Sequence, residues 1–218
     1  MRAYRFLAVL AAFAVGISAA PVVMKQYTPG KQKIKDEIDA MVTQGYAPVG
    51  IELAVQGTAK TLYVLFDIDP DKEAKAWHIG TYRNSAEAVA AIGAEIKKGN
   101  TPCDIAWSAT QCFVLYVRFE EPVTEAIVLS AKLGSTFDNL VDDYEGKGYC
   151  PIGFTLESEG VAAVLFVKWA EPIIDEYEMP AYKTAAALEK DMAGRVSDGF
   201  SPCGFMMAKG QFWVFAIK

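Results

Sequence analysis

A six-residue motif recurs four times along the chain and constrains its fold more than any other feature. It reads GYAPVG at 45–50, GNTPCD at 99–104, GYCPIG at 148–153 and GFSPCG at 199–204. Glycine opens each copy and proline follows three residues later, and the copies recur about every fifty residues, the spacing of a repeated structural unit. The sequence therefore predicts one supersecondary unit repeated four times.

A helical pattern precedes each copy of the motif. Apolar residues recur at spacings of three, four and seven: Ile34, Ile38, Met41 and Val42; Val89, Ile92 and Ile96; Phe137, Leu140, Val141 and Tyr144; Leu188, Met192 and Val196. Asn84 with Glu87 predicts a capping box, and Ser135 and Thr184 stand where N-caps belong. The motif then supplies a left-handed residue that ends each helix and a proline that prevents its continuation. Eight residues receive these structural roles: Gly45, Pro48, Gly99, Pro102, Gly148, Pro151, Gly199 and Pro202.

Extended segments complete the unit as β-α-β-β. One precedes each helix (22–27, 76–82, 126–132 and 176–182), and a strongly apolar one closes each unit (62–66, 113–117, 163–167 and 212–217). The predicted units are 20–68, 74–119, 124–169 and 174–218. The fold class is therefore α+β: four tandem βαββ repeats with mainly antiparallel sheets and helices packed on one face. Because the links are short, we expect the last strand of one unit to form a hairpin with the first strand of the next, giving about twelve strands and four helices.

The closing strand of each unit is apolar on both faces. Phe113, Leu115 and Val117 alternate with Val114 and Tyr116, whereas a sheet with one solvated face alternates apolar and polar residues. The second face is therefore covered either by a sheet from elsewhere in the chain or by a second protomer.

The units resemble a group of small bacterial βαββ domains of unknown function. That group is marked by an amphipathic helix ending in Gly-Trp, and some members carry Gly-Trp-x-Pro-x-Gly, which is similar to GYAPVG, GYCPIG and GFSPCG. The tryptophan is replaced here by Tyr46, Asn100, Tyr149 and Phe200, and Asn100 with Asp104 makes the second unit the most divergent. The resemblance implies the fold and no activity. The chain is also similar, more faintly, to periplasmic domains that bind denuded peptidoglycan strands, although their usual element order differs.

Residues 1–19 are typical of a secretory signal peptide. Arg2 and Arg5 precede an apolar run over 6–15, which is shorter than the roughly 20 residues that a membrane-spanning helix needs. Pro21 favours cleavage after Ala19 over cleavage after Ala20, and an uncleaved anchor is the alternative. The expected location is the periplasm or the extracellular space, where disulfides are permitted.

The charge balance excludes nucleic acid as the expected partner. Lys and Arg number 21 against 27 Asp and Glu, giving a net charge of −6, whereas binding to phosphates needs a basic surface. With 52% hydrophobic and 22% charged residues, the chain has the composition of a protein with a large core.

The four cysteines, Cys103, Cys112, Cys150 and Cys203, are each candidates for a disulfide or a thiol. Alignment of the second and fourth units places Cys103 and Cys112 at opposite ends of one hairpin, too far apart for a bridge. Cys103, Cys150 and Cys203 share the helix-exit end, so one bridge can form among them. Cys112 is then either a free or intermolecular thiol or a buried small hydrophobe.

No catalytic, metal-binding or cofactor-binding residue is predicted. His78 is the single histidine and lies in an expected strand without a recognisable nucleophile, and there is no zinc-site spacing. Asp67, Asp69, Asp71 and Glu73 begin like a calcium loop, but Lys72 and His78 replace its glycine and glutamate, so a solvated acidic turn is the better interpretation. The four tryptophans, Trp77, Trp107, Trp169 and Trp213, are expected to be mostly core residues.

The sequence thus favours an exported, non-enzymatic protein that binds or assembles with an envelope or extracellular macromolecule, either a protein or a polymer. Repeated units offer an extended surface and edge strands that could add a partner's strand, and the chain could self-associate. The alternatives are a glycan- or peptidoglycan-binding protein or hydrolase acting through carboxylates and His78, and a periplasmic inhibitor or chaperone-like partner of a secreted protein.

Overall fold

The computed structural model describes residues 20–218 except 30–32, 57–58, 69–72, 109–110 and 171–175. The signal segment predicted over 1–19 lies outside the described residues. The chain is an α+β protein with antiparallel sheets, as the sequence predicted at that level. Its helices are α1 (Lys33–Thr43), α2 (Ser85–Lys97), α3 (Ser135–Glu145) and α4 (Ala185–Ser197). Its strands are β1 (Val22–Tyr27), β2 (Ala47–Gln56), β3 (Ala59–Asp67), β4 (Ala76–Tyr82), β5 (Thr101–Trp107), β6 (Cys112–Arg118), β7 (Glu125–Lys132), β8 (Cys150–Ser158), β9 (Val161–Lys168), β10 (Tyr177–Glu178), β11 (Ala181–Tyr182), β12 (Ser201–Ala208) and β13 (Gln211–Ile217).

Four separate sheets follow one another along the chain, one in each of the segments 20–68, 74–119, 124–169 and 174–218, which we call units 1 to 4. In units 1 to 3 the closing strand lies in the middle, in the orders β1-β3-β2, β4-β6-β5 and β7-β9-β8. In unit 4, β13 lies between β12 and the pair β10 and β11. The hairpins predicted between units are wrong, because the closing strand of each unit is already paired on both sides and has no free edge for the next unit.

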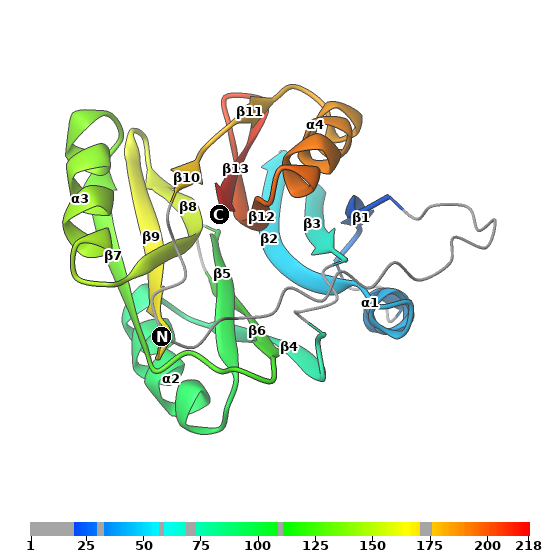
Figure 1. Cartoon of the computed structure of the whole chain (residues 1–218), viewed down its shortest axis with the longest axis horizontal. Helices are drawn as coiled ribbons and strands as arrows, with labels where there is room; N and C mark the ends of the chain where they lie inside the picture. The colour runs from blue at the N-terminus through cyan, green and yellow to red at the C-terminus, as the bar shows by residue number, and fades with distance from the viewer. Residues whose placement is uncertain (1–19, 30–32, 57–58, 69–72, 109–110, 171–175) are drawn as a thin grey trace, which may run out of the picture.

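The four sheets form a ring. Strand β2 contacts β5, β5 contacts β8, β8 contacts β12, and β12 contacts β2 again. These four strands, which we call the central strands, lie in the interior, and the helices lie around the outside (Figure 1). Unit 4 therefore packs against unit 1 and closes the ring.

Four hydrophobic clusters fill the interfaces between neighbouring units. Ile38 and Met41 of α1 share a cluster with Leu115 and Val117 of β6, and the other clusters join units 2 and 3, units 3 and 4, and units 4 and 1 in the same way. Val114 and Tyr116, on the opposite face of β6, pack in the cluster that contains Ala88 and Ile92 of α2. The chain's own sheets therefore cover both faces of this strand.

Two local details differ from the sequence expectation. The first strand of unit 4 is divided into β10 and β11 by Met179 and Pro180, because proline has no N–H to donate to the ladder. The N-cap of α3 is Gly134, with φ +105°, and Ser135 is the first helical residue. The other caps form: the Asn84 side chain accepts from Glu87 N at 2.9 Å, and Thr184 Oγ1 accepts from Ala187 N at 3.1 Å.

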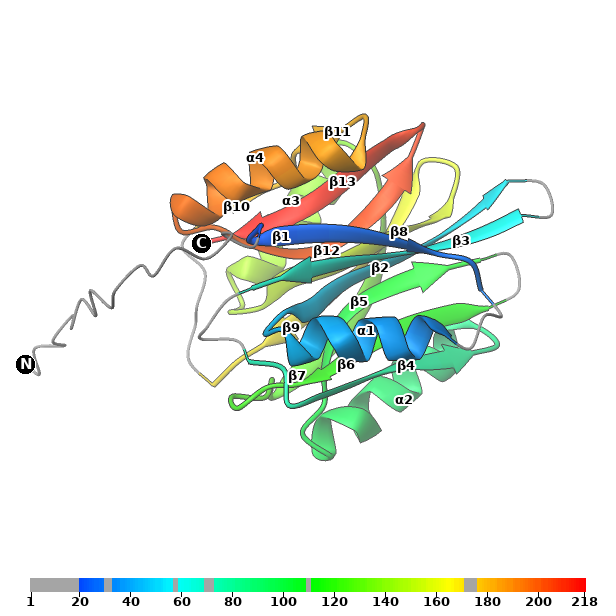
Figure 2. The ribbon, with the colours of Figure 1, turned by 90° about the vertical axis from the view of Figure 1, so that its right-hand side faces the viewer.

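The ring has two unlike ends, which Figure 2 shows from the side. At one end the helices finish and the central strands begin; β1 also starts there and β13 finishes there, so we call it the termini end. At the other end each unit turns from its central strand into its closing strand, and we call it the hairpin end. Across the described residues, no helix combines the length and the apolar character needed to span a membrane.

Candidate functional site

The motif glycines lie at the helix C-termini. Gly45, Gly99, Gly148 and Gly199 have φ values of +93°, +81°, +81° and +93°. In each case the glycine N–H donates to the carbonyl three residues earlier, and the next N–H donates to the carbonyl five residues before itself, as in Gly45 to Val42 at 2.9 Å and Tyr46 to Met41 at 3.1 Å. This pattern is a Schellman motif. The prolines are the second residues of the central strands.

The sixth residue of each motif copy lies at the middle of the ring. These residues are Gly50, Asp104, Gly153 and Gly204, and each of the four central strands has a register shift there. A Cβ placed on Gly153 would lie 2.6 Å from Asp104 Oδ1 and 2.8 Å from its Cα. Glycine at this position therefore lets the backbones approach closely.

Asp104 joins three of the units at this point. Its Oδ2 accepts hydrogen bonds from Ile51 N at 2.8 Å and Phe205 N at 3.1 Å, and its Oδ1 accepts from Ile105 N at 2.8 Å. The residue is fully buried. Burial raises the pKa of its carboxyl well above the usual range, and the three N–H donors oppose that rise. The carboxyl thus supplies an acceptor to backbone N–H groups of three units.

A polar pocket of about 310 Å³ opens at the hairpin end. We call it the hairpin-end pocket. Residues from all four central strands line it, together with the turn of unit 4: Glu52, Leu53, Ala54, Val55, Trp107, Thr155, Leu156, Met207 and Gly210. Among these described residues Glu52 is the only one with an ionisable side chain. A volume of this size is at the lower end of the range for small-ligand sites.

Glu52 is buried although it lines the pocket, with 6% of its surface exposed. Its Oε1 accepts from Leu53 N at 2.9 Å and its Oε2 from Met207 N at 3.4 Å. Burial raises the pKa of this carboxyl to about 8, against the smaller opposing effect of the two N–H donors. At neutral pH the side chain is therefore mostly an uncharged acid, able to donate one hydrogen bond.

An apolar groove of about 290 Å³ lies beside this pocket, between the hairpins of units 1 and 2. It shares Leu53 with the pocket, and its other lining residues are Pro29, Ile34, Lys60, Leu62, Ile79, Thr81, Gln111 and Phe113. Val55, which lines the pocket, is 49% exposed. The hairpin end therefore combines a polar pocket with an adjoining apolar surface.

The cysteines are thiols. All four lie in the described part of the chain and none is in a disulfide, so of the two alternatives, disulfide or thiol, this structure has the thiol. Cys103 and Cys203 line one small apolar pocket of about 60 Å³ at the termini end, and Cys203 Sγ lies 3.7 Å from Pro151 O. Cys112 is fully buried, and burial raises the pKa of its thiol to about 12, so it packs as a small hydrophobe.

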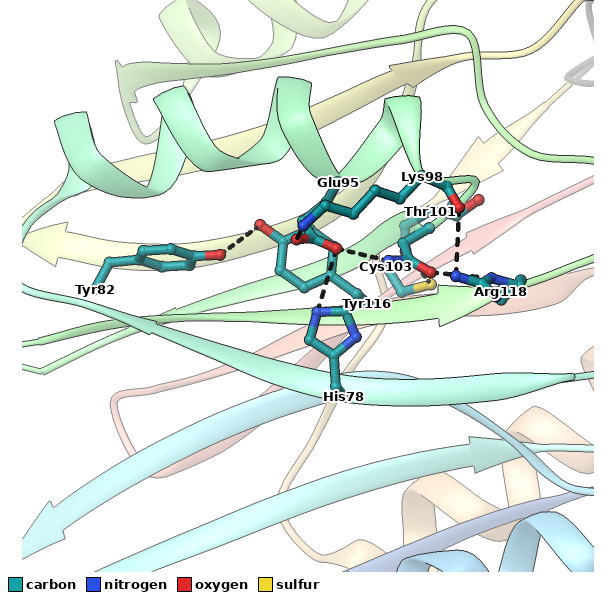
Figure 3. Close-up of polar contacts among 9 residues, drawn as sticks. His78, Tyr82, Glu95, Lys98, Thr101, Cys103, Tyr116 and Arg118 are labelled. Carbon is teal, nitrogen blue, oxygen red and sulfur yellow. Dashed lines mark hydrogen bonds and ion pairs between the residues drawn. The ribbon is translucent and has the colours of Figure 1, made fainter.

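His78 belongs to a polar network on unit 2 that Figure 3 shows in close-up. Its Nε2 lies 3.5 Å from Glu95 Oε2, and its ring stacks on Tyr116. Glu95 also accepts from Lys98 at 2.6 Å and from Asn100 at 2.6 Å, and these contacts lower the pKa of its carboxyl. Arg118 Nε in turn donates to Asn100 Oδ1 at 3.2 Å. The network joins the end of α2 to β6, which gives Asn100 a structural role.

The remaining candidates stay dispersed. Asp69 and Asp71 of the calcium-like turn lie outside the described residues, and within those described no group of three potential metal ligands occurs. Trp107 lines the hairpin-end pocket and Trp169 lines the apolar pocket at the termini end. Trp77 Nε1 donates to Asp39 Oδ1 at 2.8 Å, and Trp213 packs beside the cluster of units 3 and 4.

Sequence reasoning missed Glu52 and the position of Asp104. Glu52 stands alone among apolar residues in APVGIELAV, and a lone acid in a buried strand is a signal that could have identified it. Asp104 was visible only as a departure from the motif. Neither a scan against protein-family models nor a search of curated proteins finds a match to this chain.

Proposed function

We propose that the protein is an exported, non-enzymatic binding protein that contacts an envelope or extracellular macromolecule through its hairpin end. The chain would be a fusion of four copies of one βαββ unit. The same helix ending in all four units supports that origin, as do a register shift in each central strand at the fifth or sixth motif residue and the contact of each central strand with the next. Export rests on the signal-like residues 1–19.

The observation that carries the binding proposal is the pocket and groove at the hairpin end. Both termini of the folded ring lie at the opposite end, with Tyr46 Oη donating to Ala20 O at 2.8 Å and Lys218 N donating to Glu176 O at 2.9 Å. The hairpin end thus lies opposite the end of the ring that holds Ala20. A partner could reach it whether that segment is cleaved or retained as an anchor.

The other surfaces offer weaker support for binding. The outer edge of β1 faces α4, where Glu189 Oε1 accepts from Met24 N at 2.8 Å, so that edge is not open to a partner's strand. Because neighbouring units cover the second face of each sheet, the apolar closing strands no longer favour self-association.

The hairpin-end pocket favours binding over hydrolysis. A glycan hydrolase acting through two carboxyls needs both of them at the substrate. Here Glu52 lines the pocket, but the oxygens of Asp104 accept three backbone hydrogen bonds below it. His78 lies in the separate network on unit 2.

A pair of matched variants tests the proposal. Val55 is 49% exposed at the hairpin end, and Val89 is 44% exposed on α2. We expect Val55→Glu to lose capture of the partner from an envelope or culture fraction, and Val89→Glu to retain it. Equal capture by the two variants, with both folded by circular dichroism, would place the contact elsewhere.

A further inference from the structure

Glu52 is a buried acid that has no counter-ion among the residues that the structure describes. Its neighbours on three of the surrounding strands carry no positive charge: Tyr63 of β3 is its partner in the ladder, and Met207 of β12 and Thr155 of β8 line the pocket with it. The remaining central strand, β5, supplies Trp107 and, beneath the pocket, the acidic Asp104, which shares the sign of an ionised Glu52. The exposed charged residues of the hairpins at this end are Lys60, Lys209 and Glu159.

Ionising such a group by itself is unfavourable, because an unpaired buried charge loses its hydration without a compensating partner. The two backbone donors provide partial compensation only, one of them at 3.4 Å. A ligand that brings a positive charge would supply what the fold lacks.

The rest of the lining limits the shape of that ligand. Leu53, Ala54, Leu156 and Met207 supply apolar surface that suits a chain of methylene groups, and Trp107 supplies an indole. Each oxygen of the Glu52 carboxyl already accepts one backbone N–H. The carboxyl therefore suits an ammonium, which is a compact point charge, better than a planar guanidinium, which binds carboxylates through two parallel hydrogen bonds. We propose that the hairpin-end pocket binds the primary ammonium group of a lysine side chain on a partner protein, with Glu52 as its counter-ion. This inference rests on the proposed binding function of the hairpin end.

Binding exchanges a proton for the ligand's charge. The neutral Glu52 acid releases its proton to solvent, and the resulting carboxylate pairs with the incoming ammonium, which keeps its own three protons. The pocket holds no net charge before or after binding. Because the free carboxyl titrates near pH 8, the apparent affinity increases about tenfold for each unit that the pH rises towards 8, and it levels off above pH 8.

The probe for this inference is Nα-acetyl-lysine amide, with Nα-acetyl-norleucine amide as the matched ligand without the ammonium. Titrations of the purified protein followed by NMR between pH 6 and pH 9 give both affinities. We expect the lysine probe to bind about tenfold more tightly at pH 9 than at pH 7, and the norleucine probe to bind weakly at every pH. In Glu52→Gln the lysine probe should lose this pH dependence and bind no better than norleucine.

Equal affinities for the two probes, or an affinity for the lysine probe that is independent of pH, would overturn the ammonium assignment. Val89→Glu serves as the control and should titrate as the wild type does. The Val55→Glu capture experiment reports on the hairpin end separately. A positive capture result with a negative lysine titration would therefore reject the ligand class and leave the proposed function standing.

Discussion

Replacing Asp104 by glycine should destabilise the protein, although glycine stands at the matching position in the other three units. The motif alone favours the opposite result, because glycine would restore the pattern of Gly50, Gly153 and Gly204. The structure places a carboxyl there that accepts three N–H groups from units 1, 2 and 4. Its removal leaves three buried donors without an acceptor at the centre of the ring.

The size of the effect follows from those three donors. A buried donor left unsatisfied costs about 1–3 kcal/mol, which gives roughly 3–9 kcal/mol for the three. Removing a buried carboxyl also removes its desolvation penalty, and water can enter the space it leaves, so we expect about 3–5 kcal/mol. That is a large part of a typical unfolding free energy of about 5–15 kcal/mol. Asp104→Asn keeps one acceptor oxygen and should lie between wild type and Asp104→Gly.

Urea unfolding at pH 7, followed by circular dichroism and tryptophan fluorescence, measures this loss. With a slope of roughly 3 kcal/mol per molar urea, the midpoint of Asp104→Gly should fall by about 1–2 M. The exposed Asp36→Asn serves as a control and should lower the midpoint by at most about 0.3 M, because it removes only a favourable charge from the first turn of α1. A midpoint for Asp104→Gly at or above that of wild type would refute the role assigned to the carboxyl.

Two further predictions concern the same interior. The pKa of Glu52 is about 8 in the folded state against an ordinary value of 4.5, so between these pH values the folded protein binds one proton more than the unfolded chain. The free energy of unfolding should therefore fall as the pH rises from about 4.5 to 8, by up to about 1.4 kcal/mol per pH unit. Glu52→Gln should flatten this part of the pH–stability curve, and an unchanged slope would contradict the shifted pKa. Gly153→Ala should lower the thermal midpoint, because its Cβ would lie 2.6 Å from Asp104 Oδ1. Gly93→Ala in α2 has no atom within 4 Å of its Cβ and should raise the thermal midpoint, through a gain in helix propensity of up to about 1 kcal/mol. Equal shifts in the two variants would show that the backbones at the centre of the ring can separate.

Local structure was largely predictable from the sequence because its signals are local. The helix endings depend on glycines with positive φ a fixed distance after an apolar stripe, and that pattern is visible in four copies. The strands β1 and β4 have the same bounds as the extended segments predicted at 22–27 and 76–82. The turn of unit 4 consists of Lys209 and Gly210, which both have positive φ between the paired residues Ala208 and Gln211.

The arrangement of the units was not predictable in the same way. A short link is compatible with a hairpin between neighbouring strands, but it cannot reveal that β3 is already paired with both β1 and β2. The apolar faces of the closing strands showed that a cover was needed and left its source open. The hairpin-end pocket was not predictable for the same reason, because Glu52 and Trp107 line one pocket only when central strands of different units pack together.

Ring closure gives one further prediction, because a closed ring has no structural first unit. Helix α4 packs against β1 as α2 packs against β7, so the contact from unit 4 to unit 1 resembles the contact from unit 2 to unit 3. Residues 119–124 connect β6 to β7, and residues 68–75 connect β3 to β4, so links of this length are enough to pass from one sheet to the next. Both termini already lie at the same end of the ring.

A circular permutant tests this closure directly. The new chain would begin at Ala74, run to Lys218, continue through a linker of roughly six residues to Pro21 and end at Ile68. We expect it to unfold in one cooperative transition with a urea midpoint close to that of the unpermuted chain over 20–218. The matched truncation that ends at Trp169 removes unit 4 and uncovers Val22, Val49 and Leu65, so it should aggregate or lose that cooperativity. A permutant that unfolds in two steps, together with a truncation that stays soluble and cooperative, would show that the interface between units 4 and 1 contributes little and that the ring is open in solution.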